Sequence, residues 1–185
     1  APAVAAGCPV IVKPASVTPL SCARFVELLH AAGLPPAWCQ TLIPENSAVS
    51  EALVTDPRIS FFSFIGSARV GWMLKSKLAP GVRCALEHGG AAPVIICDDA
   101  DLDLTVTALT KGGYYHAGQV CVSVQRVFVP RALSGAFVEK FQAAVEKLIV
   151  GDPTNIETQV GPLIRPKEVE RVHNWVSAAI DGGAI

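Results

Sequence analysis

One cysteine of this sequence stands in a loop whose neighbours suit nucleophilic chemistry. Cys121 follows Gly118 and Gln119, between a predicted helix and a predicted strand. Thiolate is the reactive form of cysteine, and a nearby base or helix end favours it, so the loop predicts an exposed nucleophile. His116 could be that base or a surface residue, and the alternative for Cys121 is a thiol packed between its two valine neighbours.

Other groups with chemical potential stand where predicted strands end. Glu87 closes an apolar run before two glycines, and a partly buried carboxylate there would have a raised pKa and could act as a general base. Lys13 ends another strand, at the edge where open parallel sheets bind ligands. Gly66 and Ser67 form a strand-to-helix turn whose backbone N–H groups suit a pyrophosphate, although ordinary turns share this composition.

The sequence lacks residues that calcium loops, NTPase phosphate loops and zinc sites require. Asp99, Asp101 and Asp103 have the spacing that opens a calcium loop, but Leu104 and Thr110 replace its glycine and glutamate, so these acids are expected to cap a helix. The glycine turn lacks the Lys-Ser/Thr pair of an NTPase loop. No Cys/His cluster has zinc spacing, so no metal site is predicted.

The elements that must position these groups alternate between strands and helices. This order predicts an α/β fold with a parallel sheet and crossover helices. Strands are expected at residues 9–13, 38–43, 60–65, 93–97 and 125–129, with a further apolar run at 82–87. Helices are expected at about 19–33, 47–55, 68–78, 101–115, 133–150 and 166–179.

Composition narrows the class of protein. The 185 residues carry a net charge of −1, with 51% hydrophobic and 17% charged residues, which predicts a packed core and argues against nucleic-acid binding. No run of about 20 apolar residues predicts a membrane span. The six cysteines are expected to be reduced and mostly buried, in a cytoplasmic protein. The mean hydropathy of +0.42 and both ends of the chain suggest a fragment of a longer protein.

Four motifs in order resemble the aldehyde dehydrogenase superfamily. Gly7–Ala15 resembles its strand and Lys-Pro turn, and Phe64–Ser67 resembles its Phe-Thr-Gly-Ser turn. Leu86–Gly90 resembles its Glu-Leu-Gly-Gly element, and Gly118–Cys121 resembles its Gly-Gln-x-Cys loop. The resemblance implies oxidation of a small-molecule aldehyde to an acid. Cys121 would form a thiohemiacetal and then, after hydride transfer to a nicotinamide, a thioester that water activated by Glu87 hydrolyses.

The resemblance also implies the cofactor contacts. Lys13 and Ser16 would face the adenosine ribose, and Gly66 and Ser67 the pyrophosphate. Many members have Glu where this sequence has Ser16, and a serine does not repel a 2′-phosphate, so the cofactor is expected to be NAD or NADP.

The resemblance covers a middle slice of the family. Residues 1–88 would be the later part of a Rossmann-like cofactor domain, and residues 89–185 the first part of an α/β catalytic domain. The family's oxyanion-binding Asn has no counterpart here, so the fragment alone is expected to be inactive, while its parent would be a homodimer or homotetramer. A thiol acyltransferase or hydrolase using Cys121 with His116, and an inactive scaffold, remain alternatives.

Overall fold

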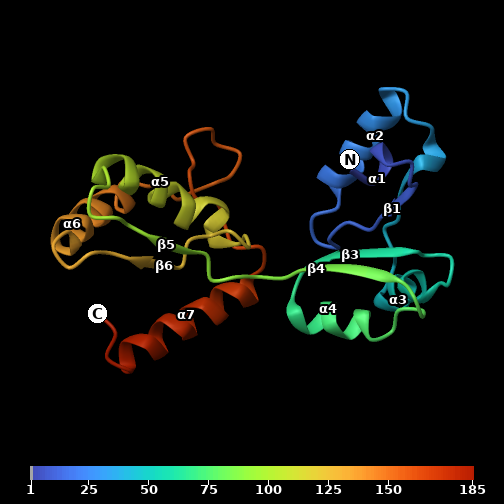
Figure 1. Cartoon of the computed structure of the whole chain (residues 1–185). Helices are drawn as coiled ribbons and strands as arrows, with labels where there is room; N and C mark the ends of the chain where they lie inside the picture. Colours follow the sequence, from blue (N-terminus) through green and yellow to red (C-terminus); the bar gives the residue numbers. More distant parts are fainter. Residues whose placement is uncertain (1) are drawn as a thin grey trace. The chain divides into compact units, whose positions relative to one another are not determined.

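The computed structural model describes residues 2–185 and divides after Glu87 into two compact units, residues 1–87 and 88–185 (Figure 1). Each unit is built from parallel strand pairs joined by helical crossovers, because parallel neighbours cannot be connected by a tight turn. The assignment of these units to cofactor binding and catalysis stays a prediction.

The first unit contains two such strand–helix–strand motifs. Its elements are α1 (Pro2–Ala5), β1 (Val10–Val12), α2 (Leu20–Ala31), the 3-10 turn η1 (Pro36–Trp38), β2 (Cys39–Thr41), α3 (Ser47–Thr55), β3 (Phe61–Ile65), α4 (Ala68–Lys75) and β4 (Arg83–Glu87). β1 pairs with β2, with Val10 opposite Cys39, and β3 pairs with β4, with Ile65 opposite Glu87. The ends of β3 and β4 therefore lie side by side.

The second unit repeats the motif once and adds two helices. Its elements are β5 (Pro93–Ile95), α5 (Leu102–Tyr114), the 3-10 turn η2 (Tyr115–Gly118), β6 (Arg126–Phe128), α6 (Ser134–Val145) and α7 (Pro166–Asp181). β5 and β6 are parallel, and α5 packs against α6. The core of this unit consists of buried side chains from α5, α6 and the residue that follows β5: Ile96, Val106, Leu109 and Phe137.

The predicted α/β class with parallel strands is confirmed, but the sheet is divided differently from the expectation. Within residues 2–185 the strands form three separate two-stranded sheets, so each strand uses one of its two edges. The helix expected over 133–150 ends at Val145, because Val150 leaves the helical path to form a parallel bridge with Val160. The helix expected from about residue 19 begins at Leu20, with Pro19 at the N-cap position and no side-chain cap.

The cysteines correct a second expectation. All six are free thiols, as predicted, but only Cys39 is buried, whereas Cys8, Cys97 and Cys121 are exposed. A two-stranded sheet has few covered positions, so a small apolar side chain is buried only where a helix packs over it, and the prediction of mostly buried cysteines was wrong. Among the described residues, no helix is long and apolar enough to cross a membrane.

Candidate active site

Cys121 lies exposed in a turn that follows three successive residues in the left-handed conformation. His116, Ala117 and Gly118 have φ values of 52°, 54° and 71°. The left-handed region costs a residue with a Cβ atom roughly 1–2 kcal/mol. Such a backbone persists only where surrounding contacts hold it, so the bonds around this loop identify what defines the position of Cys121.

Gln119 makes the contacts on the amino side of Cys121. Its Nε2 donates to the backbone oxygens of His116, at 3.0 Å, and Pro162, at 3.3 Å. Its Oε1 accepts from the backbone N–H of Ile164 at 2.8 Å. One side chain thus joins the Cys121 loop to the segment before α7.

Ser123 and Gln125 make the contacts on the carboxyl side. The Ser123 side chain is buried, and its Oγ donates to the backbone oxygen of Gly113 at 3.0 Å. Gln125 Nε2 donates to the backbone oxygen of Gly90 at 2.7 Å. A Cβ atom at Gly90 would lie 3.4 Å from the Cys121 carbonyl oxygen, so the chain at Gly90 passes close to the nucleophile loop.

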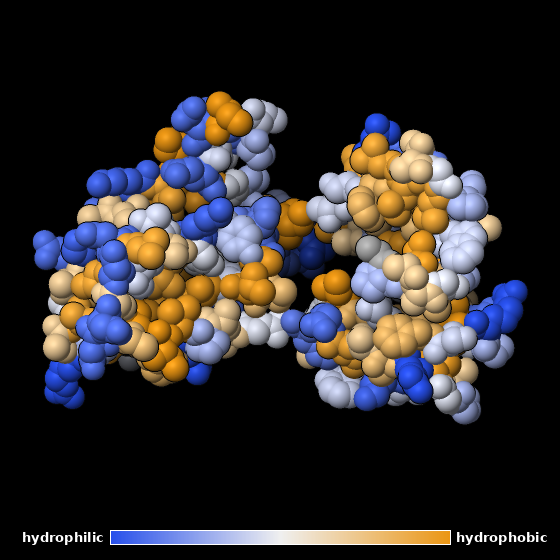
Figure 2. Space-filling view, turned by 45° about the horizontal axis from the view of Figure 1, so that its top comes forward, coloured by the Kyte–Doolittle hydropathy of each residue, from blue (hydrophilic) through white to orange (hydrophobic). Residues whose placement is uncertain are grey.

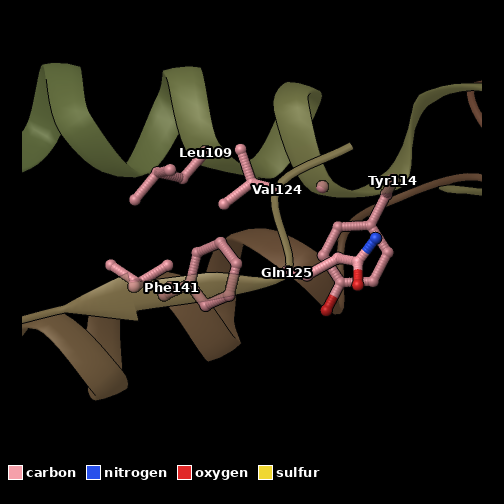
Figure 3. A pocket seen from close by; sticks show the side chains of 7 residues that line it. Leu109, Tyr114, Val124, Gln125 and Phe141 are labelled. Atoms are coloured by element: carbon pink, nitrogen blue, oxygen red, sulfur yellow. The ribbon is translucent and has the colours of Figure 1, made fainter. Parts of the chain in front are cut away.

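An open cavity of about 320 Å³ lies beside this loop and is lined by α5, β6 and α6. Figure 3 shows Tyr114 and Gln125 toward one end of the cavity, with Leu109 and Phe141 further along it. Cys121 is not among its lining residues. Val124 and Gln125, which follow Cys121 closely in the sequence, line the cavity, but the candidate nucleophile itself does not.

His116 is not arranged as a base for the thiol. Its ring packs against Tyr115, with ring centroids 4.9 Å apart. Within residues 2–185 no hydrogen bond joins His116 to Cys121.

Glu87 ends β4 in the first unit, and its side chain is exposed. The expected partial burial of Glu87 is not found among residues 2–185: Glu87 pairs with Ile65 at the end of the two-stranded sheet, and its side chain is exposed there. The Glu87 backbone oxygen accepts the N–H of Gly66 at 3.0 Å, so the structure does bring Glu87 next to the Gly66–Ser67 turn.

The Gly66–Ser67 turn is a close-packed helix start. A Cβ atom at position 66 would come within 2.6 Å of the Phe64 ring, so only glycine fits without a shift. Ser67 Oγ accepts the backbone N–H of Val70 at 3.4 Å and caps α4. The turn presents the amino end of α4, as the anion-binding prediction requires.

Lys13 and Ser16 are both exposed after β1. Lys13 Nζ donates to the backbone oxygen of Pro14 at 2.8 Å, which holds the ammonium group at the carboxyl end of the strand. Ser16 lies in a turn closed by the Thr18 N–H and the Ala15 oxygen. Both side chains are exposed near the carboxyl end of β1, and their contact with a ligand stays a prediction.

The acidic cluster at the start of α5 caps that helix, as expected. Asp101 Oδ1 accepts the backbone N–H groups of Asp103 and Leu104, at 2.9 and 3.1 Å. Among residues 2–185, no three His, Cys, Asp or Glu side chains gather as a metal site would require. Sequence reasoning did not identify roles for Gln119, Ser123 or Gln125, because their partners are backbone groups that leave no motif.

The chain belongs to the aldehyde dehydrogenase family, whose pattern it matches over residues 1–185. It is 41% identical over 184 residues to the 3-sulfolactaldehyde dehydrogenase of Priestia aryabhattai, covering 99% of this chain and 38% of that protein. It is 40% identical to the mitochondrial succinate-semialdehyde dehydrogenase of Arabidopsis thaliana, covering 99% of this chain and 35% of that one. The chain therefore spans little more than a third of the length of these relatives.

Solved structures agree with this assignment. An NAD-dependent aldehyde dehydrogenase from Sinorhizobium meliloti superposes with a TM-score of 0.91 at 34% identity, over 98% of this chain and 36% of that one. An NADP-dependent enzyme from E. coli also has a TM-score of 0.91, at 37% identity, over 98% of this chain and 38% of that one. The similarity thus extends to the three-dimensional fold of nearly all 185 residues.

Proposed function

We propose that the protein carrying these residues oxidises an aldehyde to a carboxylic acid with NAD or NADP as hydride acceptor. The observation that carries the proposal is an exposed Cys121 in a loop held from both sides, in a chain of the aldehyde dehydrogenase family. The named substrates of the two relatives, 3-sulfolactaldehyde and succinate semialdehyde, share the aldehyde carbonyl that such a thiol attacks.

The chemistry assigns distinct roles to the thiol and the carboxylate. The Cys121 thiolate adds to the carbonyl carbon and forms a thiohemiacetal. The nicotinamide, when bound, accepts the hydride that leaves this carbon, and a thioester remains. Glu87 takes a proton from the water that hydrolyses the thioester, which releases the acid and regenerates the thiol.

The residues present fit a dinucleotide cofactor. The amino end of α4 at Gly66 and Ser67 offers backbone N–H groups, which suit a pyrophosphate. Lys13 and Ser16 stand exposed after β1 and would contact the adenosine ribose. Because Ser16 brings no negative charge, both a ribose hydroxyl and a 2′-phosphate are compatible with this position.

The assembly and the compartment belong to the same proposal. We expect a homodimer or homotetramer, which the many exposed apolar side chains support. Six free cysteines favour a reducing compartment such as the cytoplasm.

The proposal is tested on the complete protein with Cys121→Ser and Glu87→Gln. Cys121→Ser should lose nearly all aldehyde-dependent reduction of NAD(P), because a serine hydroxyl is far less ionised than a thiol. Glu87→Gln should retain hydride transfer and slow hydrolysis, since only hydrolysis needs an activated water, so stopped-flow absorbance should show a burst of reduced cofactor before a slow steady state.

The matched control is Cys97→Ser, another exposed thiol that the proposal leaves unused. It should keep native turnover. Steady-state turnover of Cys121→Ser within a few-fold of the native protein would contradict the role of Cys121, and an equal loss of both steps in Glu87→Gln would contradict the role of Glu87.

A further inference from the structure

We propose that Gln119 is a positioning residue for the nucleophile: its carboxamide fastens the Cys121 loop to the segment 162–164 and so holds the thiol in its reactive place. The inference rests on the proposed function only in taking Cys121 as the nucleophile. Gln119 itself is directed at backbone groups and not at the thiol.

The carboxamide fits its three backbone partners completely. The amide nitrogen of glutamine has two hydrogens, and the two acceptors are the oxygens of His116 and Pro162. The amide oxygen faces the remaining partner, the N–H donor of Ile164. A carboxylate at the same place would offer no hydrogen to the two carbonyl oxygens, and an alanine would make none of the three bonds.

The segment that Gln119 reaches is itself well anchored. Val150 and Val160 form a parallel bridge, and Gln159 Oε1 accepts the N–H of Ile149 at 3.0 Å. The turn between them is closed by Asp152, which accepts the N–H of Thr154 at 2.8 Å and its hydroxyl at 2.7 Å. These bonds hold the pKa of Asp152 below its usual 3.8. These bonds hold the chain that leads into residues 162–164, the segment to which Gln119 attaches the loop.

The loop needs such an attachment because its backbone is unfavourable. His116 and Ala117 have Cβ atoms and positive φ angles, so without contacts from the rest of the chain these two residues would adopt other backbone conformations. The His116 oxygen accepts both the backbone N–H and the side-chain Nε2 of Gln119, at 3.1 and 3.0 Å. Gln119 thus holds the strained turn closed and ties it to a distant segment at the same time.

The first test compares Gln119→Ala and Gln119→Glu in the complete protein. Both variants should slow the alkylation of Cys121 by iodoacetamide, which peptide mass spectrometry measures. Both should also lower kcat by about 10- to 100-fold with little change in the KM for cofactor, because a displaced nucleophile loses its alignment. The matched control is Gln142→Ala, which removes an exposed glutamine that bonds only to Glu146 near the end of α6. It should leave both rates unchanged.

A pH series separates positioning from general loss of structure. In Gln119→Glu, acidification from about pH 8 to about pH 4 protonates much of the carboxylate, whose ordinary pKa is about 4.3, and restores one donor, since a neutral carboxyl carries an O–H. The ratio of native to variant alkylation rate should therefore shrink as the pH falls. For Gln119→Ala, which has nothing to protonate, the ratio should stay constant.

A measurement on the native protein guards against variants that fail to fold. Hydrogen–deuterium exchange should find the Ile164 amide protected, because Gln119 Oε1 is its acceptor. A freely exchanging Ile164 amide would overturn the proposal, as would folded Gln119 variants whose Cys121 alkylation and kcat stay within two-fold of native. Because alkylation and exchange need no aldehyde, a failure of the proposed oxidation would appear separately, as absent turnover in the native protein.

Discussion

At the scale of single residues, the candidate site is held mainly by side chains that bind backbone groups. The backbone oxygens of Gly90, Gly113 and Pro162 receive hydrogens from Gln125, Ser123 and Gln119 respectively. Amide and hydroxyl side chains suit this task because they donate without bringing a charge that would compete with a thiolate or carboxylate. These side chains therefore add no charge beside Cys121 and Glu87, the two residues to which we assign the chemistry.

Ser16 is predicted to govern the choice between the two cofactors. Ser16→Glu should weaken NADP more than NAD, by about tenfold in the ratio of dissociation constants, because the new carboxylate repels a 2′-phosphate. Titration of both cofactors into the complete protein measures this ratio. Ser16→Ala, which removes the hydroxyl without adding charge, is the control and should leave the preference nearly unchanged. An unaltered ratio in Ser16→Glu would place Ser16 away from the ribose.

Gly66 is predicted to tolerate no side chain. Gly66→Ala should lower the free energy of unfolding by about 1–3 kcal/mol, as overpacking does, because the new methyl group would stand 2.6 Å from the Phe64 ring. Urea denaturation of the complete protein measures the change. Gly135→Ala in α6, where nothing lies within 4 Å, is the control and should be neutral or stabilising. Equal stability of the two variants would show that the Phe64 ring moves aside freely.

At the scale of elements, three helices begin at side chains that accept their first N–H groups. Asn46 caps α3, Ser67 caps α4 and Asp101 caps α5. These caps fix the start of α3, α4 and α5. In α5 the far end leads directly into the left-handed turn before Cys121.

The cap of α5 is predicted to stabilise the second unit. Asp101→Ala should lower the free energy of unfolding by about 1 kcal/mol, since two N–H groups lose their acceptor. Asp99→Ala is the matched control: it removes an acid of the same cluster that makes no side-chain hydrogen bond among residues 2–185, and it should change stability far less. Chemical denaturation followed by circular dichroism compares them, and equal losses would mean that the cluster acts through its total charge.

At the scale of the whole chain, much apolar surface is uncovered. Figure 2 shows hydrophobic residues on the visible surface of both units. Ile65 at the end of β3 and Ile95 at the end of β5 are 80% and 76% exposed. Two-stranded sheets with a single covering layer bury little, and exposed patches of this kind favour association.

The 185 residues by themselves are therefore predicted to self-associate. Size-exclusion chromatography with light scattering should find species larger than a 19.4 kDa monomer. The double variant Ile65→Thr and Ile95→Thr should shift the distribution toward the monomer, because threonine keeps the branched shape that strands favour and removes apolar surface. A monodisperse, folded monomer of the unmodified chain would contradict the prediction.

The sequence by itself determined what depends on neighbouring residues. The order of strands and helices follows from local apolar periodicity, and the cap at Asp101 from the helix start beside it. The exposed Cys121 follows from a glycine-containing loop between two such elements. These features need no partner from elsewhere in the chain, so patterns and a family resemblance were sufficient to predict them.

Tertiary structure decided what depends on residues far apart in the chain. Gln119 meets Pro162 and Ile164 across 43 and 45 positions, and Gln125 meets Gly90 across 35. Backbone acceptors look alike in any sequence, so only folding selects which of them a glutamine reaches. The exposure of Glu87 and of three of the six cysteines has the same origin, because burial depends on which element packs over a side chain and not on the side chain's own type.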